Sequence, residues 1–139
     1  MRATDPRLTK QALEKLVIKT ERRPILIIAI AHGGLIAGMD LFLRYMDINP
    51  ESVFYPIRFS NRKYKDKEPR IESTEKTALS IEAKSRDIVI FDEDVSSGTT
   101  LKKTGIFFEG LFGKKPILAA NLAVPFPELV YGEEINFEL

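Results

Sequence analysis

The sequence predicts an α/β fold in which an open, mainly parallel sheet carries helices on both faces. Three apolar runs have the length of buried strands, at residues 24–31, 87–91 and 116–124. Parallel strands are buried on both faces, so they are continuous apolar runs rather than alternating ones. Helical spacing of apolar residues follows two of these runs, at residues 35–46 and 99–112. Strands that alternate with helices along a chain indicate a parallel sheet.

The remaining elements follow from local signals. Residues 9–20 have apolar side chains at helical spacing behind Thr9, which we expect to cap a helix. Residues 52–59 read as a strand, and Pro56 indicates an edge strand or a strand end because proline cannot donate a hydrogen bond to a central ladder. The predicted order is helix 9–20, strand 24–31, helix 35–46, strand 52–59, strand 87–91, helix 99–112 and strand 116–124.

Length, charge and composition limit the possible classes of protein. A chain of 139 residues is expected to form one domain, residues 1–139. The net charge of +1 gives no overall field for nucleic acid, so a nucleic-acid partner is not expected. The chain has no cysteine, which removes disulfides and thiolate metal sites. Its first residues are polar and its apolar runs are too short to span a bilayer, so we expect a cytoplasmic protein without membrane association.

One long segment has almost no apolar residues. Residues 60–76, SNRKYKDKEPRIESTEK, lie between two predicted strands, and their first half is basic. Composition alone favours a solvated surface loop. Loops longer than about 12 residues in a compact domain are, however, often lids or binding loops. Both interpretations stay open on these residues alone: a solvated loop, or a mobile lid that closes over a ligand.

Carboxylates and a hydroxyl-rich loop follow the strand 87–91. The carboxylates are Asp92, Glu93 and Asp94. The loop residues are Ser96, Ser97, Gly98, Thr99 and Thr100. A helix that begins near Thr99 presents free N–H groups and a positive dipole end, which bind phosphate. Carboxylates repel phosphate, so both features fit a ligand with a phosphate at one end and hydroxyl groups or Mg²⁺ at the other, such as a sugar phosphate. The alternative is an ordinary helix cap beside solvated acids.

Residues 88–100, IVIFDEDVSSGTT, resemble the signature of the type I phosphoribosyltransferases. The signature consists of an apolar run, an acidic pair, and a loop of small residues, glycine and a hydroxyl residue. The resemblance implies the type I phosphoribosyltransferase fold with a small C-terminal hood, and binding of phosphoribosyl pyrophosphate (PRPP) with Mg²⁺. In this family the acidic pair binds the ribose, which implies ribose and metal contacts for Asp92 and Glu93. The family's hydroxyl loop holds the 5-phosphate, which implies that role for Ser96, Ser97, Gly98, Thr99 and Thr100.

The resemblance extends to the segment after the first predicted strand. The family has a pyrophosphate loop there, and this chain has His32, Gly33 and Gly34. Glycines at this place expose backbone N–H groups to the pyrophosphate. His32 stands where the family usually has Arg or Lys, and at its ordinary pKa near 6.5 it is mostly neutral at pH 7. The resemblance implies that these residues bind pyrophosphate.

A mobile loop follows the second core strand in the family, and residues 60–76 lie at the corresponding place. The resemblance implies that Arg62 binds pyrophosphate, and that Lys63 and Lys65 act in catalysis together with the acidic pair. Such a loop reaches into the neighbouring subunit of a dimer in related enzymes. The resemblance therefore also implies a homodimer.

Residues 125–139 loosely resemble the hood that covers the purine in hypoxanthine and xanthine phosphoribosyltransferases. Leu129, Tyr131 and Phe137 are the candidates for contacts to the base. The same apolar and aromatic side chains are equally expected to complete the core.

Two positions depart from the enzymes that use hypoxanthine, guanine or xanthine. Ser96 stands where those enzymes have an aspartate, and Val124 stands where they have a lysine. We therefore expect an enzyme that transfers the phosphoribosyl group of PRPP to a nucleobase, in the manner of purine salvage, with release of pyrophosphate. A noncatalytic PRPP- or nucleotide-binding regulator on the same fold is the alternative. An unrelated flavodoxin-like protein would require the order of residues 88–100 to be accidental.

Overall fold

The computed structural model describes residues 2–30, 34–58 and 69–135. The helices are α1 (Pro6–Thr20), α2 (Gly34–Met46), α3 (Ser73–Ala83) and α4 (Thr99–Phe112). The strands are β1 (Ile25–Ile30), β2 (Val53–Ile57), β3 (Asp87–Val95), β4 (Ile117–Ala123) and β5 (Val130–Glu134). The five described strands form one parallel sheet in the order β2-β1-β3-β4-β5. The predicted fold class is confirmed.

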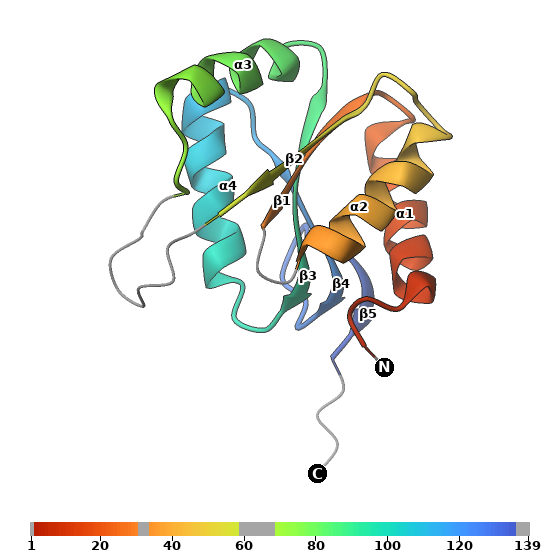
Figure 1. Cartoon of the computed structure of the whole chain (residues 1–139). Coiled ribbons are helices and arrows are strands. Elements are labelled where there is room, and N and C mark those ends of the chain that lie inside the picture. The colour runs from red at the N-terminus through yellow and green to blue at the C-terminus, as the bar shows by residue number, and fades with distance from the viewer. Residues whose placement is uncertain (1, 31–33, 59–68, 136–139) are drawn as a thin grey trace.

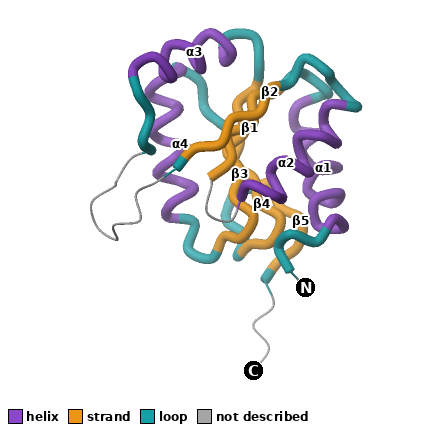
Figure 2. Tube along the Cα trace, in the orientation of Figure 1, coloured by secondary structure: helices purple, strands orange, loops and turns teal. Residues whose placement is uncertain are grey.

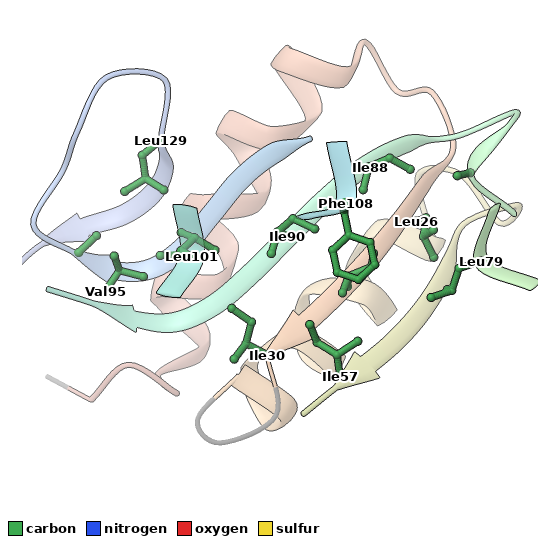
Figure 3. Close-up of a cluster of buried hydrophobic side chains, with 14 residues drawn as sticks. Leu26, Ile30, Ile57, Leu79, Ile88, Ile90, Val95, Leu101, Phe108 and Leu129 are labelled. Carbon is green, nitrogen blue, oxygen red and sulfur yellow. The ribbon is translucent and has the colours of Figure 1, made fainter. Parts of the chain in front are cut away.

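Helices cover the sheet on both faces, with α1 and α2 on one side and α3 and α4 on the other (Figure 1). The strand β1 is fully buried, and its side chains alternate between the two layers. Ile25 and Ile27 pack with α1 and α2, whereas Leu26 and Ile28 face α3 and α4. Figure 3 shows the second layer, in which Phe108 of α4 lies over the sheet. Burial on both sides explains why the strand has no polar positions.

The order of the strands creates a switch point between β1 and β3. The chain leaves β1 through α2 to reach β2 at the edge, and returns over the other face through α3 to β3. The segments that follow β1 and β3 therefore diverge toward opposite faces. Ligands of open α/β sheets bind at such a point, beyond the carboxyl ends of the strands. The edge position predicted for the strand with Pro56 is confirmed.

The first helix begins earlier than its apolar pattern suggested. α1 starts at Pro6, and its N-cap is Asp5 rather than Thr9. The Asp5 carboxylate accepts a hydrogen bond from the Arg7 amide at 2.9 Å, and proline suits the first helical position because it has no N–H to satisfy. Thr9 is instead buried inside the helix.

Helix α3 is an element that the sequence patterns did not predict. It connects β2 to β3, a crossover that a parallel pair requires. Its amino end is a capping box, in which Glu72 and Glu75 each accept a hydrogen bond from the other's backbone N–H. Leu79 and Ala83 are its buried residues. The segment 60–76 is therefore not one loop, because its last residues, from Ser73, are the first turn of this helix.

Strand β3 is longer than the apolar run that predicted it. It continues through the three carboxylates to Val95, and β4 pairs with it along this extension. Asp92 lies opposite Ala120, and Asp94 lies opposite Leu122. The acids thus belong to the strand itself rather than to a loop after it, because the ladder to β4 holds the backbone extended.

The connection between β4 and β5 contains no helix. Because the two strands are parallel, residues 124–129 must return from the carboxyl end of β4 to the amino end of β5. Leu129, which ends this connection, is buried on the α4 side of the sheet (Figure 3). Part of the segment predicted as a hood, Val130–Glu134, is therefore the fifth strand of the core sheet.

Helix α1 packs closely on β5. A Cβ at Gly132 would lie 2.5 Å from the backbone oxygen of Asn121 and 2.7 Å from that of Leu8, so only glycine fits there. The ammonium of Lys15 donates to the Tyr131 carbonyl at 2.7 Å. The first helix is thus fixed to the last described strand. Among the helices that the structure describes, none is both long and apolar enough to cross a membrane.

Candidate functional site

The loop between β3 and α4 lies at the carboxyl edge of the sheet (Figure 2). Its last residue, Gly98, is the N-cap of α4 and has a φ of 77°, in the left-handed region that favours glycine. Gly98 has no side chain with which to cap the helix. The Ser97 hydroxyl accepts a hydrogen bond from the Thr99 amide at 3.3 Å. A helix amino end with so little side-chain capping is suited to an anion.

A pocket of about 110 Å³ is built on this loop. Its walls are Asp92, Asp94 and Val95 of β3 together with residues 96–101. The hydroxyls of Ser97 and Thr99 lie 3.2 Å apart, so the loop gathers its donors in one place. The structure thus brings Asp92 together with all five hydroxyl-loop residues that the sequence singled out.

Burial perturbs the acids beside this pocket. It raises the pKa of Asp92 to about 6, and the neighbouring carboxylates of Glu93 and Asp94 add to the effect. Burial, and then the charge of Asp94, also raises the pKa of Glu93. A buried carboxylate that has no cation beside it is stabilised in its charged form when a ligand brings hydroxyl donors or a metal ion to it. The two acids are therefore prepared for a ligand that supplies such groups.

Glu93 faces differently from its two neighbours. Successive side chains of a strand point to opposite faces of the sheet, and Glu93 does not line the pocket although Asp92 and Asp94 do. Its Oε2 is buried and has no hydrogen-bond partner in the part of the chain that the structure describes. The strand register places it across from Asn121, whose Oδ1 is likewise buried and finds no hydrogen-bond partner among the described residues. The second acid of the pocket wall is therefore Asp94.

The donor set suits a metal that brings most of its own ligands. Within residues 2–30, 34–58 and 69–135, no three acidic or histidine side chains are grouped so as to hold a metal ion. Mg²⁺ in phosphate sites typically uses one or two carboxylates, water and the phosphate oxygens of the substrate. Asp92 and Asp94, which line the pocket, fit this incomplete set.

Solved structures of purine phosphoribosyltransferases have the same architecture. The enzyme from Pyrococcus horikoshii Ot3 is 22% identical with a TM-score of 0.59, over 95% of this chain and 83% of that chain. The chain has the phosphoribosyltransferase fold. The hypoxanthine phosphoribosyltransferase from Staphylococcus aureus gives 15% identity and a TM-score of 0.59, over 95% and 74% of the two chains. The xanthine-guanine-hypoxanthine phosphoribosyltransferase from Helicobacter pylori gives 15% and 0.58, over 89% and 78%.

The likeness to these structures is one of fold. No protein-family model matches the chain, and no curated protein matches it by sequence. The resemblance that residues 88–100 indicated is therefore confirmed at the level of architecture. The assignment of individual residues rests on the geometry of the site.

Several predicted site residues lie outside the described part of the phosphoribosyltransferase fold. They are His32, Gly33, Arg62, Lys63, Lys65 and Phe137. Gly34 is described and is the first residue of α2. It therefore begins the helix that follows β1, at the same edge of the sheet as the pocket.

The two described candidates for base contacts are not among the residues that line the pocket. Leu129 is buried in the layer of side chains beneath α4. Tyr131 belongs to β5, and the Lys15 ammonium lies 4.1 Å from the centre of its ring. Neither side chain lines the pocket that contains Asp92, so the structure does not bring them together with the hydroxyl loop.

Sequence reasoning missed two residues at the carboxyl edge of the sheet. Asp94 lies outside the acidic pair of the signature, although the alternation of a continued strand places it on the same side as Asp92. Val124 was noted only as a missing lysine. Its amide donates to the Val95 carbonyl at 2.8 Å, which places it directly beside the strand that leads into the pocket.

Proposed function

We propose that the protein is a phosphoribosyltransferase that binds PRPP with Mg²⁺ and transfers the phosphoribosyl group to a nucleobase, with release of pyrophosphate. The observation that carries this proposal is the pocket at the carboxyl edge of the sheet, which joins Asp92 to a hydroxyl loop at the amino end of α4. A phosphate and a ribose are held side by side by such a set of groups. The fold shared with purine phosphoribosyltransferases supports the same reading.

The 5-phosphate occupies the pocket in this proposal. Ser96, Ser97, Thr99 and Thr100 offer hydroxyl donors, and the first N–H groups of α4 add the positive end of the helix dipole. Gly98 keeps the backbone open to the phosphate. Several hydrogen bonds to one dianion fix its position, which is the main contribution of such a loop to catalysis.

The ribose hydroxyls bind to the acids of β3. Asp92 and Glu93 have this role by their place in the signature, and Asp94 joins them because it lines the pocket. The carboxylates accept hydrogen bonds from the hydroxyl groups and thereby recover solvation lost on burial. They also carry negative charge close to a sugar ring on which positive charge develops as pyrophosphate leaves, and so stabilise that transition state. Mg²⁺, when bound, supplies charge neutralisation for the departing pyrophosphate.

Most of the proposed pyrophosphate and lid contacts come from residues outside the described part of the chain, whereas Gly34 and residues 69–72 are described. We assign pyrophosphate binding to His32, Gly33, Gly34 and Arg62, and catalytic contacts to Lys63 and Lys65 of the predicted lid. The lid, residues 60–72 once the first turn of α3 is removed, closes over the ligand and excludes water from the reacting carbon. Ordering a segment so poor in apolar residues needs charge-assisted hydrogen bonds as compensation.

A homodimer forms part of the proposal, and α2 offers a surface for it. Its outer side exposes four large apolar residues at helical spacing, namely Leu35, Ile36, Met39 and Leu43. Contiguous apolar stripes on a helix surface are typical of contacts between subunits. Because α2 follows the predicted pyrophosphate loop, a contact there would bring two active sites near each other.

A noncatalytic regulator that binds PRPP or a nucleotide is the second candidate. It is favoured by Val124, which lies beside Val95 at the place where relatives that use oxopurines have a lysine. Without that donor the exocyclic oxygen of the base loses a hydrogen-bond partner, at a cost of about 1–3 kcal/mol. PRPP binding is expected for the transferase and for a regulator that binds PRPP, so binding alone does not separate these two.

Two measurements test the proposal. Calorimetry of PRPP with Mg²⁺ should show saturable binding, and a pyrophosphate-release assay with a panel of purine and pyrimidine bases should show turnover with at least one of them. Binding without turnover on any base supports the regulator. Absence of PRPP binding contradicts the transferase and a regulator that binds PRPP, and leaves only a regulator that binds a nucleotide.

A further inference from the structure

The crossover between β4 and β5 leaves part of the sheet uncovered. A helical crossover would pack over the sheet beside α4, whereas residues 124–129 form a short irregular connection with a turn at Pro127 and Glu128. A groove therefore lies between α4 and this connection. It has a volume of about 380 Å³ and does not include the acids or the hydroxyl loop of the phosphate pocket. This volume lies in the range of small-molecule sites, about 300–1,000 Å³.

The floor and sides of the groove are mostly apolar. Ile117 and Leu118 of β4 form part of the lining, Ile106 comes from α4, and Phe126 and Pro127 come from the connection. The Ile106 side chain is 72% exposed although it lies in the lining. A large apolar side chain left open at the side of a groove contributes favourable contacts to a ligand that covers it.

Lysines dominate the charged groups of the groove. Lys19, Lys102 and Lys115 line it together with Glu109 and Glu128, which leaves one net positive charge. Lys115 is paired with Glu128 at 2.7 Å, and the Lys19 ammonium donates to the Glu128 carbonyl at 3.2 Å. The ammonium groups of Lys19 and Lys115 therefore already have partners within the protein.

Lys102 is in a different situation. Within the part of the chain that the structure describes, no carboxylate pairs with its ammonium, which instead lies 4.3 Å from the centre of the Phe126 ring. An ammonium over an aromatic face keeps most of its capacity to bind an anion, because the ring accepts no hydrogen bond of comparable strength. Lys102 therefore presents an available donor next to a flat apolar surface.

We propose that this groove is a second ligand site, which binds a small planar apolar molecule carrying one carboxylate. The aromatic part of the ligand covers Ile106, Leu118 and Pro127, and the carboxylate pairs with Lys102. A single negative charge matches the net charge of the lining, whereas a phosphate dianion would exceed it. The proposal is independent of the phosphoribosyltransferase activity, since it uses none of the residues assigned to PRPP.

The groove shares a wall with the phosphate loop. A Cβ at Gly98 would lie 3.0 Å from Phe126 and 3.5 Å from the Cε of Lys102, so both side chains pack against the N-cap of α4. Phe126 therefore separates a ligand in the groove from the proposed 5-phosphate site. The two sites need separate measurements, one with the carboxylate alone and one with ribose 5-phosphate alone.

The test is a nuclear magnetic resonance titration of the isotope-labelled full chain with cinnamate, using the neutral analogue cinnamamide for comparison. We expect saturable amide shifts at Gly105, Ile106 and Leu118 with cinnamate. Lys102→Met should weaken cinnamate binding about fivefold, the loss of one partly exposed ion pair, and leave the weaker cinnamamide binding unchanged. Ile106→Glu should abolish cinnamate binding by charge repulsion while preserving the helix.

Lys103→Met is the matched control, because Lys103 is an exposed neighbour on α4 that does not line the groove. It should bind cinnamate as the unmodified protein does. Equal binding of cinnamate by Lys102→Met and Lys103→Met, or shifts confined to residues 96–100, would overturn the proposal. A loss of ribose 5-phosphate binding in Lys102→Met would likewise assign this cation to the phosphate pocket instead.

Discussion

The Val124 amide donates a hydrogen bond to the Val95 carbonyl at 2.8 Å, across the carboxyl ends of β4 and β3. The Val124 side chain is 37% exposed at this edge. A residue at position 124 therefore stands next to the strand end from which the hydroxyl loop departs. Its identity is expected to influence which base is accepted.

Val124→Lys should raise the use of hypoxanthine or guanine. The added ammonium supplies a donor for the exocyclic oxygen, and a partner worth about 1–3 kcal/mol corresponds to a rise in kcat/KM of roughly 5- to 150-fold. Val124→Met is the control, since it adds similar length without charge. The measurement is the rate of pyrophosphate release with each base, and equal rates for the two variants would separate position 124 from base selection.

Gly98→Ala should weaken ribose 5-phosphate binding by at least about tenfold, because the new Cβ displaces Phe126 and disturbs the N-cap of α4. Gly113→Ala is a matched control: its φ is 70°, close to the 77° of Gly98, but nothing lies within 4 Å of its added Cβ. Both variants should lose about 1–2 kcal/mol of stability from the left-handed backbone. Calorimetry measures the affinity of each variant for ribose 5-phosphate, which should fall only in Gly98→Ala. Equal affinities in the two variants would place the 5-phosphate elsewhere.

Asp92 should make the free energy of unfolding depend on pH. Its pKa rises from the ordinary 3.8 to about 6 in the folded protein, so the folded state holds this proton when the unfolded state has lost it. Stability therefore falls as pH rises from about 4 to about 6 and stays lower above that. Asp92→Asn should remove this dependence and stabilise the protein near neutral pH by at most about 3 kcal/mol.

Urea unfolding at a series of pH values measures this effect. Glu14→Gln, at an exposed position on α1, is the control and should keep the slope of the unmodified protein. If the free energy of unfolding of Asp92→Asn depends on pH as it does in the unmodified protein, the Asp92 carboxyl is not desolvated.

Asp94→Asn should weaken Mg²⁺-dependent PRPP binding by about three- to tenfold, since Asp94 lines the pocket although it lies outside the acidic pair of the signature. The double change Asp92→Asn with Glu93→Gln should weaken it by at least about tenfold. PRPP binding by the single variant Glu93→Gln shows how much of the loss in the double variant comes from Glu93 and how much from Asp92. If Asp94→Asn binds PRPP normally while Glu93→Gln does not, the ligand approaches the face of the strand opposite to the pocket.

Leu43→Glu should convert a dimer to a monomer if α2 forms the subunit contact. Leu43 is 57% exposed on the apolar side of α2, and a buried unpaired carboxylate at an interface is strongly unfavourable. Ile81→Glu is the control. Ile81 is 61% exposed on α3, which covers the face of the sheet opposite to α2. Sedimentation equilibrium measures the mass, and a dimer that persists in Leu43→Glu would exclude α2 from the contact.

Patterns in the sequence predicted the parts of the fold that depend on local burial. The run 24–31 and the helix 99–112 correspond to β1 and α4 because continuous or periodic burial leaves a direct pattern. Helix α3 has a weakly amphipathic sequence with two buried residues, so its apolar pattern was too sparse. β5 was hidden because it includes Gly132, and that glycine is required by the close approach of α1 rather than by the strand.

The sequence likewise predicted only the part of the candidate site that depends on neighbouring residues in the chain. The hydroxyl loop and Asp92 lie together as expected, because they are consecutive in the chain and need only a strand, a turn and a helix. The positions of Asp94 and Val124 depend on how far β3 extends and on which strand pairs with it. Such pairing is set by residues far away in the chain, and no local pattern reports it.

The attachment of α1 to β5 has a consequence for how the protein is made. A helix of 15 residues is marginal on its own, and the apolar side of α1 packs on strands more than 90 residues later in the chain. During translation α1 can pack early on β1 and α2, but the part of its apolar side that contacts β4 and β5 stays exposed until those strands emerge. Stable structure should arrive in one late step, and nascent chains stopped before residue 130 should be the ones that chaperones retain.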